Sequence, residues 1–181
     1  MSNLIDIIKK RHSVRNFKDK SVDNDIIFSI VEAARLSPSA CNAQPWRFIV
    51  VTDKPLLRDI VNKGMGGIVP NAWALSAPVI IIGCAVLNIV THRIGEIVKG
   101  IHYHQIDMGI AMEHMVLRAT EMGLGTCWIG WFNEKKIKKI LNIPKGWKII
   151  SLLAMGYPRE EIDSQTSRLN TNDILFFNKV K

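Results

Sequence analysis

Two short segments near the start of this 181-residue chain carry closely spaced cationic and amide side chains. The first runs from Arg11 through His12, Ser13 and Val14 to Arg15. Alternate positions of an extended segment point to one side, so Arg11, Ser13 and Arg15 can share a face. Guanidinium groups form paired hydrogen bonds with phosphate or carboxylate, and a serine hydroxyl adds a short neutral one. The spacing predicts an anion-binding face, although an arbitrary pair of arginines is more often a pair of solvated surface charges.

The second segment is the polar stretch from Pro38 to Trp46, which runs directly into an apolar run. Ser39, Asn42 and Gln44 offer donors and acceptors in a loop whose prolines prevent a helix. Side chains of this kind suit a flat heterocycle whose edge alternates donors and acceptors. An ordinary turn between a helix and a strand explains the same residues equally well.

A third segment, from Gly123 to Gly130, follows a long helical pattern. Glycines at positions 123 and 125 allow the backbone to pass close to a ligand, and the residues after them could present N–H groups to a flat ring. A helix end followed by a core strand is the alternative. The order of helix, glycines and strand is the reverse of a dinucleotide-binding fingerprint.

Other reactive side chains indicate a functional site less strongly. Arg168 is a third cation near the end of the chain, and one arginine alone proves little. The five histidines lack the spacing of a metal site. Cys41 and Cys127 have no identifiable base beside them and are better interpreted as small core residues than as nucleophiles. Three tryptophans either wall a pocket or belong to the core: Trp73, Trp128 and Trp131.

The elements that must position these residues can be predicted from periodicity, caps and breakers. Strands are expected at 46–52, 79–86, 126–130 and 148–155. Helices are expected from Leu4 to the basic stretch 9–11, from Asp23 to Leu36, from Asp53 to Gly64, from His102 to Met122, and from Asn133 to Leu141. The helix 102–122 is apolar over most of its circumference, which is typical of a central helix or a subunit interface. Strands and helices intermix, so we expect one α/β or α+β domain spanning 1–181.

Bulk properties exclude several classes of protein. Apolar residues make up 48% of the chain, which argues against disorder. The net charge of +8 comes from lysines and arginines spread along the chain rather than from a dense basic run, so nucleic-acid binding is not favoured. The apolar run 78–87 is too short to cross a bilayer, and the first residues are too polar for a signal peptide. We expect a cytoplasmic protein with reduced cysteines.

The last part of the chain is polar and then ends in an apolar cluster, Ile174 to Phe177. These four residues have no local partner in the sequence. They must pack on another surface, either within this chain or on a second copy.

Taken in order, the motifs resemble those of the nitroreductase family. The family's R-R-S-x-R motif is similar to Arg11–Arg15, and its A-P-S-x-x-N-x-Q-P-W motif is similar to Ser37–Trp46. A G-L-G-T-x-W-I-G stretch is matched at Gly123–Gly130, and a late G-Y-P at Gly156–Pro158 is followed by Arg168. The match covers nearly the whole chain, and the first two motifs together are specific.

The resemblance implies an α+β fold with a mostly antiparallel or mixed central sheet, an intertwined homodimer, and two FMN sites at the interface. By position, Arg11, Ser13 and Arg168 would hold the FMN phosphate and ribityl chain, and Arg15 the pyrimidine edge. The Pro38–Asn42 loop would come from the partner, and the tail of about 160–181 would pack on it. The complete set of expected FMN-binding residues is Arg11, His12, Ser13, Arg15, Pro38, Ser39, Ala40, Asn42, Gln44, Asn71, Cys127, Trp128, Ile129, Gly130 and Arg168.

The resemblance also implies an activity. We hypothesise a ping-pong oxidoreductase in which NADH or NADPH gives hydride to flavin N5 and a nitroaromatic, a quinone or a related acceptor then takes the electrons, with no catalytic side chain required. The alternatives are reductive dehalogenation, flavin fragmentation, and flavin binding without turnover. Three departures from the family pattern stand out: His12 in place of Arg or Lys, Ile129 where many larger members carry Glu, and a short stretch at 87–100.

Overall fold

Strand β2 (Val79–Val86) lies inside a four-stranded sheet in the computed structural model, which describes residues 3–66, 69–87, 100–160 and 166–180. The strand order is β1 (Trp46–Val51), β2, β4 (Trp147–Gly156) and β3 (Gly125–Ile129). Each neighbouring pair is antiparallel, with Ile81 opposite both Val50 and Leu153. The four predicted strands are therefore confirmed, with ends that differ by at most one residue.

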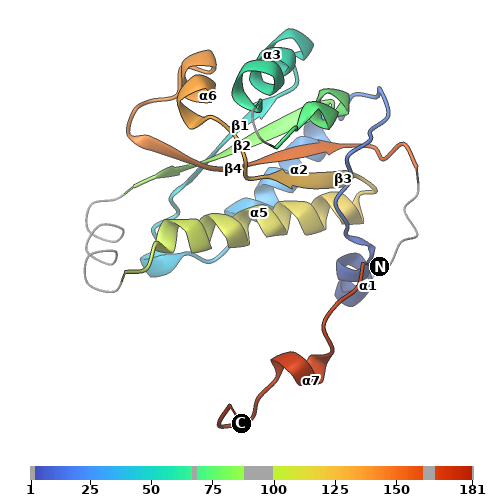
Figure 1. Cartoon of the computed structure of the whole chain (residues 1–181), viewed down its shortest axis with the longest axis vertical. Coiled ribbons are helices and arrows are strands. Elements are labelled where there is room, and N and C mark those ends of the chain that lie inside the picture. The colour runs from blue at the N-terminus through green and yellow to red at the C-terminus, as the bar shows by residue number, and fades with distance from the viewer. Residues whose placement is uncertain (1–2, 67–68, 88–99, 161–165, 181) are drawn as a thin grey trace.

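The side chains of β2 alternate between two apolar cores, which explains its uninterrupted apolar sequence. Ile81 packs into the core shared with the long helices, whereas Ile80 and Ile82 pack into the core on the opposite face. All three side chains are fully buried. The sheet is consequently covered by helices on both sides (Figure 1).

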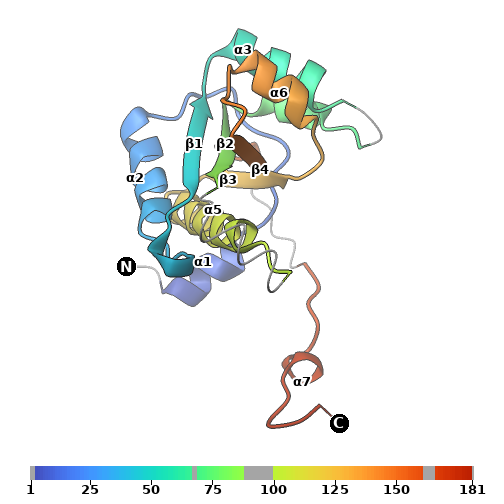
Figure 2. The same ribbon diagram turned by 90° about the vertical axis from the view of Figure 1, so that its left-hand side faces the viewer.

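Helices α2 (Asn24–Arg35) and α5 (Tyr103–Glu121) cover one face of the sheet (Figures 1 and 2). Met108, Met112 and Met115 of α5 are fully buried against the sheet, so α5 has the central position that was one of its two predicted locations. The apolar pattern did not predict the buried polar residues of α5. His104 and Asp107 are buried, whereas Ile106 is 52% exposed.

The opposite face is covered by α3 (Lys54–Asp59), η2 (Ile60–Gly64), η3 (Ala72–Ser76) and α6 (Glu134–Ile140). Two predicted caps are formed: Asp53 Oδ1 accepts from the Leu56 N–H at 2.9 Å, and Asn133 Oδ1 from the Lys136 N–H at 3.0 Å. Asp23 precedes α2 in extended conformation, but its side chain makes no capping hydrogen bond.

The two ends of the described chain leave apolar side chains exposed. Helix α1 (Leu4–Lys10) exposes Leu4, Ile5 and Ile8. The tail, with its short helix α7 (Thr171–Ile174), extends away from the body (Figures 1 and 2). The apolar cluster 174–177 is exposed in the single chain, so its packing on a second copy stays a prediction.

Two further expectations concern the stretch at 87–100 and membrane-spanning helices. The short stretch at 87–100 lies almost wholly outside the described residues. Among the helices that are described, none has the length and apolar character needed to cross a membrane.

Candidate functional site

The segment after α1 crosses the ends of two neighbouring strands. The Val14 N–H donates to the Thr126 carbonyl of β3 at 2.9 Å, and the Lys18 N–H donates to the Tyr157 carbonyl after β4 at 2.8 Å. Val14 and Phe17 are each 1% exposed, because both side chains insert into the core beneath the segment. Backbone bonds and two buried side chains thus fix residues 11–18 on the sheet.

The exposed side chains of this segment follow the predicted alternation. Ser13 and Arg15 are exposed on either side of the buried Val14. Both lie beside the thiol of Cys127: burial raises the pKa of Cys127, and Arg15 and Ser13 act in the opposite direction. The Arg15 guanidinium carbon lies 5.9 Å from the ring centroid of Trp73, within the range of a cation–π contact.

Arg11 has an acidic neighbour that the sequence did not indicate. Glu113 of α5 is half-buried, and burial raises its pKa, while Arg11, the Trp128 indole and His114 act in the opposite direction. Glu113 therefore lies close enough to Arg11 and Trp128 for both to act on its charge. Glu113 is one of three carboxylates on α5, and nothing in the sequence distinguished it for this role.

The outer edge of β3 is only partly covered by another backbone. The Thr126 carbonyl points to this edge, where it accepts from Val14. Because backbone groups alternate along a strand, the N–H of Trp128 points to the same edge, where the described residues provide no backbone partner. Gly125 permits the close approach of the segment, because an added Cβ would lie 2.8 Å from the Val14 Cβ. A Cβ at Gly130 would meet nothing within 4 Å.

Asn71 lies at the end of β3. It is 8% exposed, and its Nδ2 donates to the carbonyl of Trp131 at 3.0 Å. Trp131 directly follows Gly130 and is 52% exposed. Asn71 therefore links the start of η3, which carries Trp73, to the end of β3.

The His12 side chain contacts the backbone two residues before it. Its Nδ1 lies 2.8 Å from the carbonyl of Lys10. Its Nε2 is buried and has no hydrogen-bond partner within the described ranges. One ring nitrogen of His12 is thus left for a partner outside the described chain.

The Pro38–Gln44 loop folds as a left-handed turn. Cys41, Asn42 and Gln44 have φ of 52°, 53° and 45°. Cys41 is exposed, so its interpretation as a small core residue is wrong, whereas Cys127 is buried as expected. The Ser39 Oγ accepts from the Gln44 N–H at 3.0 Å, and the Ala40 N–H donates to Asp107 Oδ1 at 3.0 Å. The loop contains one 3₁₀ turn, η1 (Ala40–Asn42), so the prediction of a loop without any helix is only partly right; Cys41 within this turn has left-handed dihedral angles.

A single copy does not bring this loop to the Arg11–Arg15 segment. The loop contacts Asp107 near the start of α5, whereas Ser13 pairs with Thr126 beyond the end of α5 (Figure 1). Arg168 is also remote: it lies on the tail, where its Nη1 donates to the carbonyl of Ser167 at 3.0 Å. The structure thus gathers Arg11–Arg15, Asn71 and Cys127–Gly130, and leaves the loop and Arg168 apart.

This arrangement can bind an elongated anion at its cationic end and a flat ring along the edge of β3. Among the described residues, no group of three or more His, Cys, Asp or Glu side chains could hold a metal ion.

Comparison with known proteins agrees with the motifs. The model of the nitroreductase family matches residues 8–157. A crystal structure of a nitroreductase family protein from Clostridium novyi NT is 36% identical, covers 90% of each chain, and has a TM-score of 0.79. An Archaeoglobus fulgidus protein with the provisional name NADH dehydrogenase/NAD(P)H nitroreductase is 31% identical over 90% of each chain.

A Bacillus subtilis FMN reductase [NAD(P)H] is 26% identical, over 96% of this chain and 78% of its own. Proteins named iodotyrosine deiodinase and 5,6-dimethylbenzimidazole synthase match at 26% and 25% identity. The family model covers most of the chain, and the fold is that of the family's solved structures. This chain therefore belongs to the nitroreductase family.

Proposed function

We propose that this protein is an FMN-dependent oxidoreductase that takes reducing equivalents from NADH or NADPH and passes them to a nitroaromatic, quinone or related acceptor. Family membership and the similarity to an FMN reductase [NAD(P)H] support the cofactor and the donor. The observation that carries the proposal is the cationic segment Arg11–Arg15, which is fixed by backbone bonds against the open edge of β3.

The described residues fit FMN in three respects. The Arg11 guanidinium and the Ser13 hydroxyl suit a phosphate, and the Arg15 guanidinium suits the pyrimidine edge of the ring. The Trp128 N–H and the open space at Gly130 suit a flat ring against the strand edge. The unpartnered His12 Nε2 leaves a polar atom for a ligand at the cationic end. When bound, FMN supplies the hydride chemistry between the nicotinamide donor and the acceptor.

The side chains have binding and orienting roles in this proposal. Arg11 binds the phosphate, and the nearby Glu113 holds the guanidinium in place. Arg15 lies between Trp73 and Cys127, which directs it toward the pyrimidine edge. Asn71 is already bonded to the Trp131 carbonyl, so it orders the end of β3 as well as adding an amide to the site.

A second copy of the chain completes the proposed site. The Pro38–Gln44 loop and Arg168 carry family motifs but lie away from Arg11 within one copy. The exposed apolar residues of α1 and of the tail provide surface for a homodimer interface. In the proposed dimer, Pro38, Ser39, Ala40, Asn42 and Gln44 of one copy face the Arg11–Arg15 segment of the other.

The visible absorption spectrum of the purified protein is the first test. We expect a flavin spectrum as purified or after incubation with FMN, and bleaching when NADH or NADPH is added without air. A parallel-line pattern in initial rates with a quinone or nitroaromatic acceptor would support release of the oxidised donor before the acceptor binds. A protein that stays colourless after incubation with FMN contradicts the proposal.

The variant Arg168→Ala tests whether the tail contributes to FMN binding. We expect FMN affinity to fall by about tenfold or more, because one charged hydrogen bond contributes roughly 1.5–3 kcal/mol. Arg58→Ala is the matched control, because Arg58 is an exposed arginine of α3, which carries none of the proposed FMN-binding residues. Equal affinities for the two variants would remove Arg168 from the site.

The relatives named iodotyrosine dehalogenase 1 homolog and iodotyrosine deiodinase give a second candidate, reductive dehalogenation of an aromatic substrate. Halide release from an iodinated tyrosine, with no turnover of quinones or nitroaromatics, would favour it. Reduction of bound FMN by neither NADH nor NADPH would indicate a flavin-binding protein without this turnover.

A further inference from the structure

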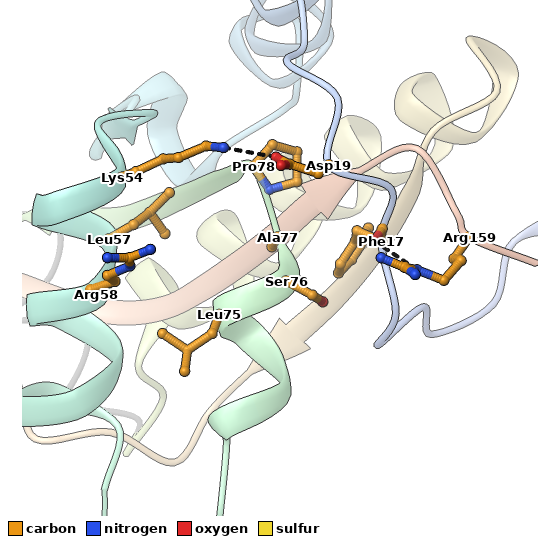
Figure 3. A pocket seen from close by; sticks show the side chains of 10 residues that line it. All are labelled: Phe17, Asp19, Lys54, Leu57, Arg58, Leu75, Ser76, Ala77, Pro78 and Arg159. Atoms are coloured by element: carbon orange, nitrogen blue, oxygen red, sulfur yellow. Dashed lines mark hydrogen bonds and ion pairs between the residues drawn. The ribbon is translucent and has the colours of Figure 1, made fainter.

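A cavity of about 220 Å³ lies between α3, η3 and the chain around Phe17 (Figure 3). It shares no residue with the proposed FMN site. The side chains that line it are Phe17, Asp19, Lys54, Leu57, Arg58, Leu75, Ser76, Ala77, Pro78 and Arg159.

The floor of the cavity is apolar. Phe17, Leu57 and Ala77 are each at most 5% exposed and belong to the core on this face of the sheet. Leu75 at the mouth is 49% exposed, although it belongs to the short helix η3. A ligand that fills the cavity would therefore cover apolar surface.

The rim carries three cations and one carboxylate. Lys54 Nζ is paired with Asp19 Oδ1 at 2.8 Å. Arg58 has no hydrogen bond or ion pair with any other residue in the described ranges. Within the described part of the chain, the one hydrogen bond of Arg159 runs from its Nε to the Phe17 carbonyl at 3.5 Å, so its terminal nitrogens keep unused donors there. Figure 3 shows the two guanidiniums on opposite sides of the Leu75–Pro78 stretch.

We propose that this cavity binds a small ring carboxylate, with the ring on the apolar floor and the carboxylate at Arg58, Arg159 or both. Guanidinium is the side-chain group that pairs best with a planar carboxylate. A cavity of about 150 Å³ holds a benzene ring, so the space here suits one ring and a short substituent. Inorganic phosphate would leave the floor uncovered, and the Asp19 carboxylate at the rim disfavours a multiply charged ligand.

Titration of the ¹⁵N-labelled full chain with benzoate tests the proposal. We expect binding in roughly the millimolar range, which is usual for a ligand of this size. The amide signals of Leu75 and Ala77 should move, and benzamide, which has the same shape without the charge, should bind much more weakly. Inorganic phosphate should leave these signals unchanged.

Two variants locate the anion contact. Arg58→Gln and Arg159→Gln should each leave the fold intact, and at least one should weaken benzoate binding about tenfold, the effect of one charged hydrogen bond. Arg47→Gln removes the same charge from β1 and should leave binding unchanged. Leu75→Glu supplies a carboxylate at the mouth and should also abolish binding.

Three results would overturn the proposal. These are unchanged benzoate affinity in both arginine variants, equal binding of benzamide, and signal changes confined to Arg15 and Trp128. The last result would assign benzoate to the proposed FMN site. Leu75 and Ala77 lie outside the proposed FMN site. A negative result at these residues therefore does not affect the FMN proposal, which is tested separately by the absorption spectrum.

Discussion

Asp107 of α5 accepts a hydrogen bond from the backbone N–H of Ala40 at 3.0 Å and so joins two residues 67 positions apart. Asp107 is 3% exposed. The residues that follow Ala40 hold the left-handed conformations of Cys41 and Asn42, which are costly for side chains other than glycine. The buried carboxylate therefore fixes a strained loop whose residues face a second copy in the proposed site.

Replacing Asp107 with Ala should loosen this loop and weaken FMN binding about tenfold, because the Ala40 N–H loses a charged partner. Asp107→Asn keeps an acceptor oxygen and should fall between wild type and Asp107→Ala. Flavin fluorescence titration gives the affinity, and urea unfolding shows whether the variants are folded. Asp23→Asn is the matched control, because the Asp23 side chain makes no capping bond. If both Asp107 variants bind FMN as the control does, the loop does not depend on this contact.

Gly125→Ala should separate the cationic segment from β3. The added Cβ would lie 2.8 Å from the Val14 Cβ, and overpacking of this kind costs about 1–3 kcal/mol. We expect both lower stability in urea and weaker FMN binding. Gly130→Ala, where the Cβ meets nothing within 4 Å, should leave the stability in urea unchanged. Equal free energies of unfolding for the two variants would mean that the Arg11–Arg15 segment moves to accommodate the added Cβ without loss of stability.

Local patterns predicted the elements better than they predicted the site. The apolar run 79–86 and the caps at Asp53 and Asn133 specified a strand and two helices, because each signal is contained in a few neighbouring residues. The motifs named Asn71 but did not predict its hydrogen bond to Trp131, 60 positions further along the chain.

Contacts across long sequence distances were not predictable in the same way. Nothing near Glu113 in the sequence indicates Arg11 or Trp128, and nothing near Asp107 indicates Ala40. On an apolar helix, each acidic side chain is equally well explained as exposed. Only the packing of α5 against two distant segments decides which carboxylate is buried and what it binds.

Glu134 of α6 should make stability depend on pH. Burial acts to raise the pKa of Glu134, but hydrogen bonds from Lys148 at 2.7 Å, from Lys138 and from the Ile149 N–H lower it overall. A lowered pKa means that this stabilisation is present above the ordinary glutamate pKa of about 4.3 and is lost as the pH falls below it.

Glu134→Gln should therefore cost about 1–3 kcal/mol at pH 7, and the difference from wild type should shrink below about pH 4. Urea unfolding at several pH values measures both quantities. Glu160→Gln, which removes an exposed carboxyl, should show no such pH-dependent difference. A constant difference between Glu134→Gln and wild type from pH 7 to pH 3.5 would contradict this account.

The cysteines should report on the proposed two-chain site. Burial raises the pKa of Cys84 to about 11, so iodoacetamide should not label it in the native protein at pH 8. Cys41 is exposed and should be labelled. Added FMN should slow the labelling of Cys41, because the loop then faces the bound cofactor. Mass spectrometry of peptides follows each site, and an unchanged Cys41 rate with FMN bound would place the loop elsewhere.

The tail should link assembly to cofactor binding. Phe176→Ser with Phe177→Ser removes two exposed aromatic side chains, which are 52% and 80% exposed in one copy. We expect a lower solution mass by light scattering and loss of FMN with every binding motif intact. Val180→Ser, also on the exposed tail, is the control. A variant that is monomeric and still binds FMN tightly would show that one copy suffices.

The pairing of residues 13–18 with Thr126 and Tyr157 also bears on how the chain folds. Both partners lie more than 110 positions along the chain, so closing these contacts costs more loop entropy than forming the helices does. The segment can dock only on strand ends that already exist. We therefore expect it to fold after the sheet and to open before the sheet does. Amide hydrogens of Val14 and Lys18 should exchange faster than those of β2, and a ligand that bridges the segment and β3 should slow them first.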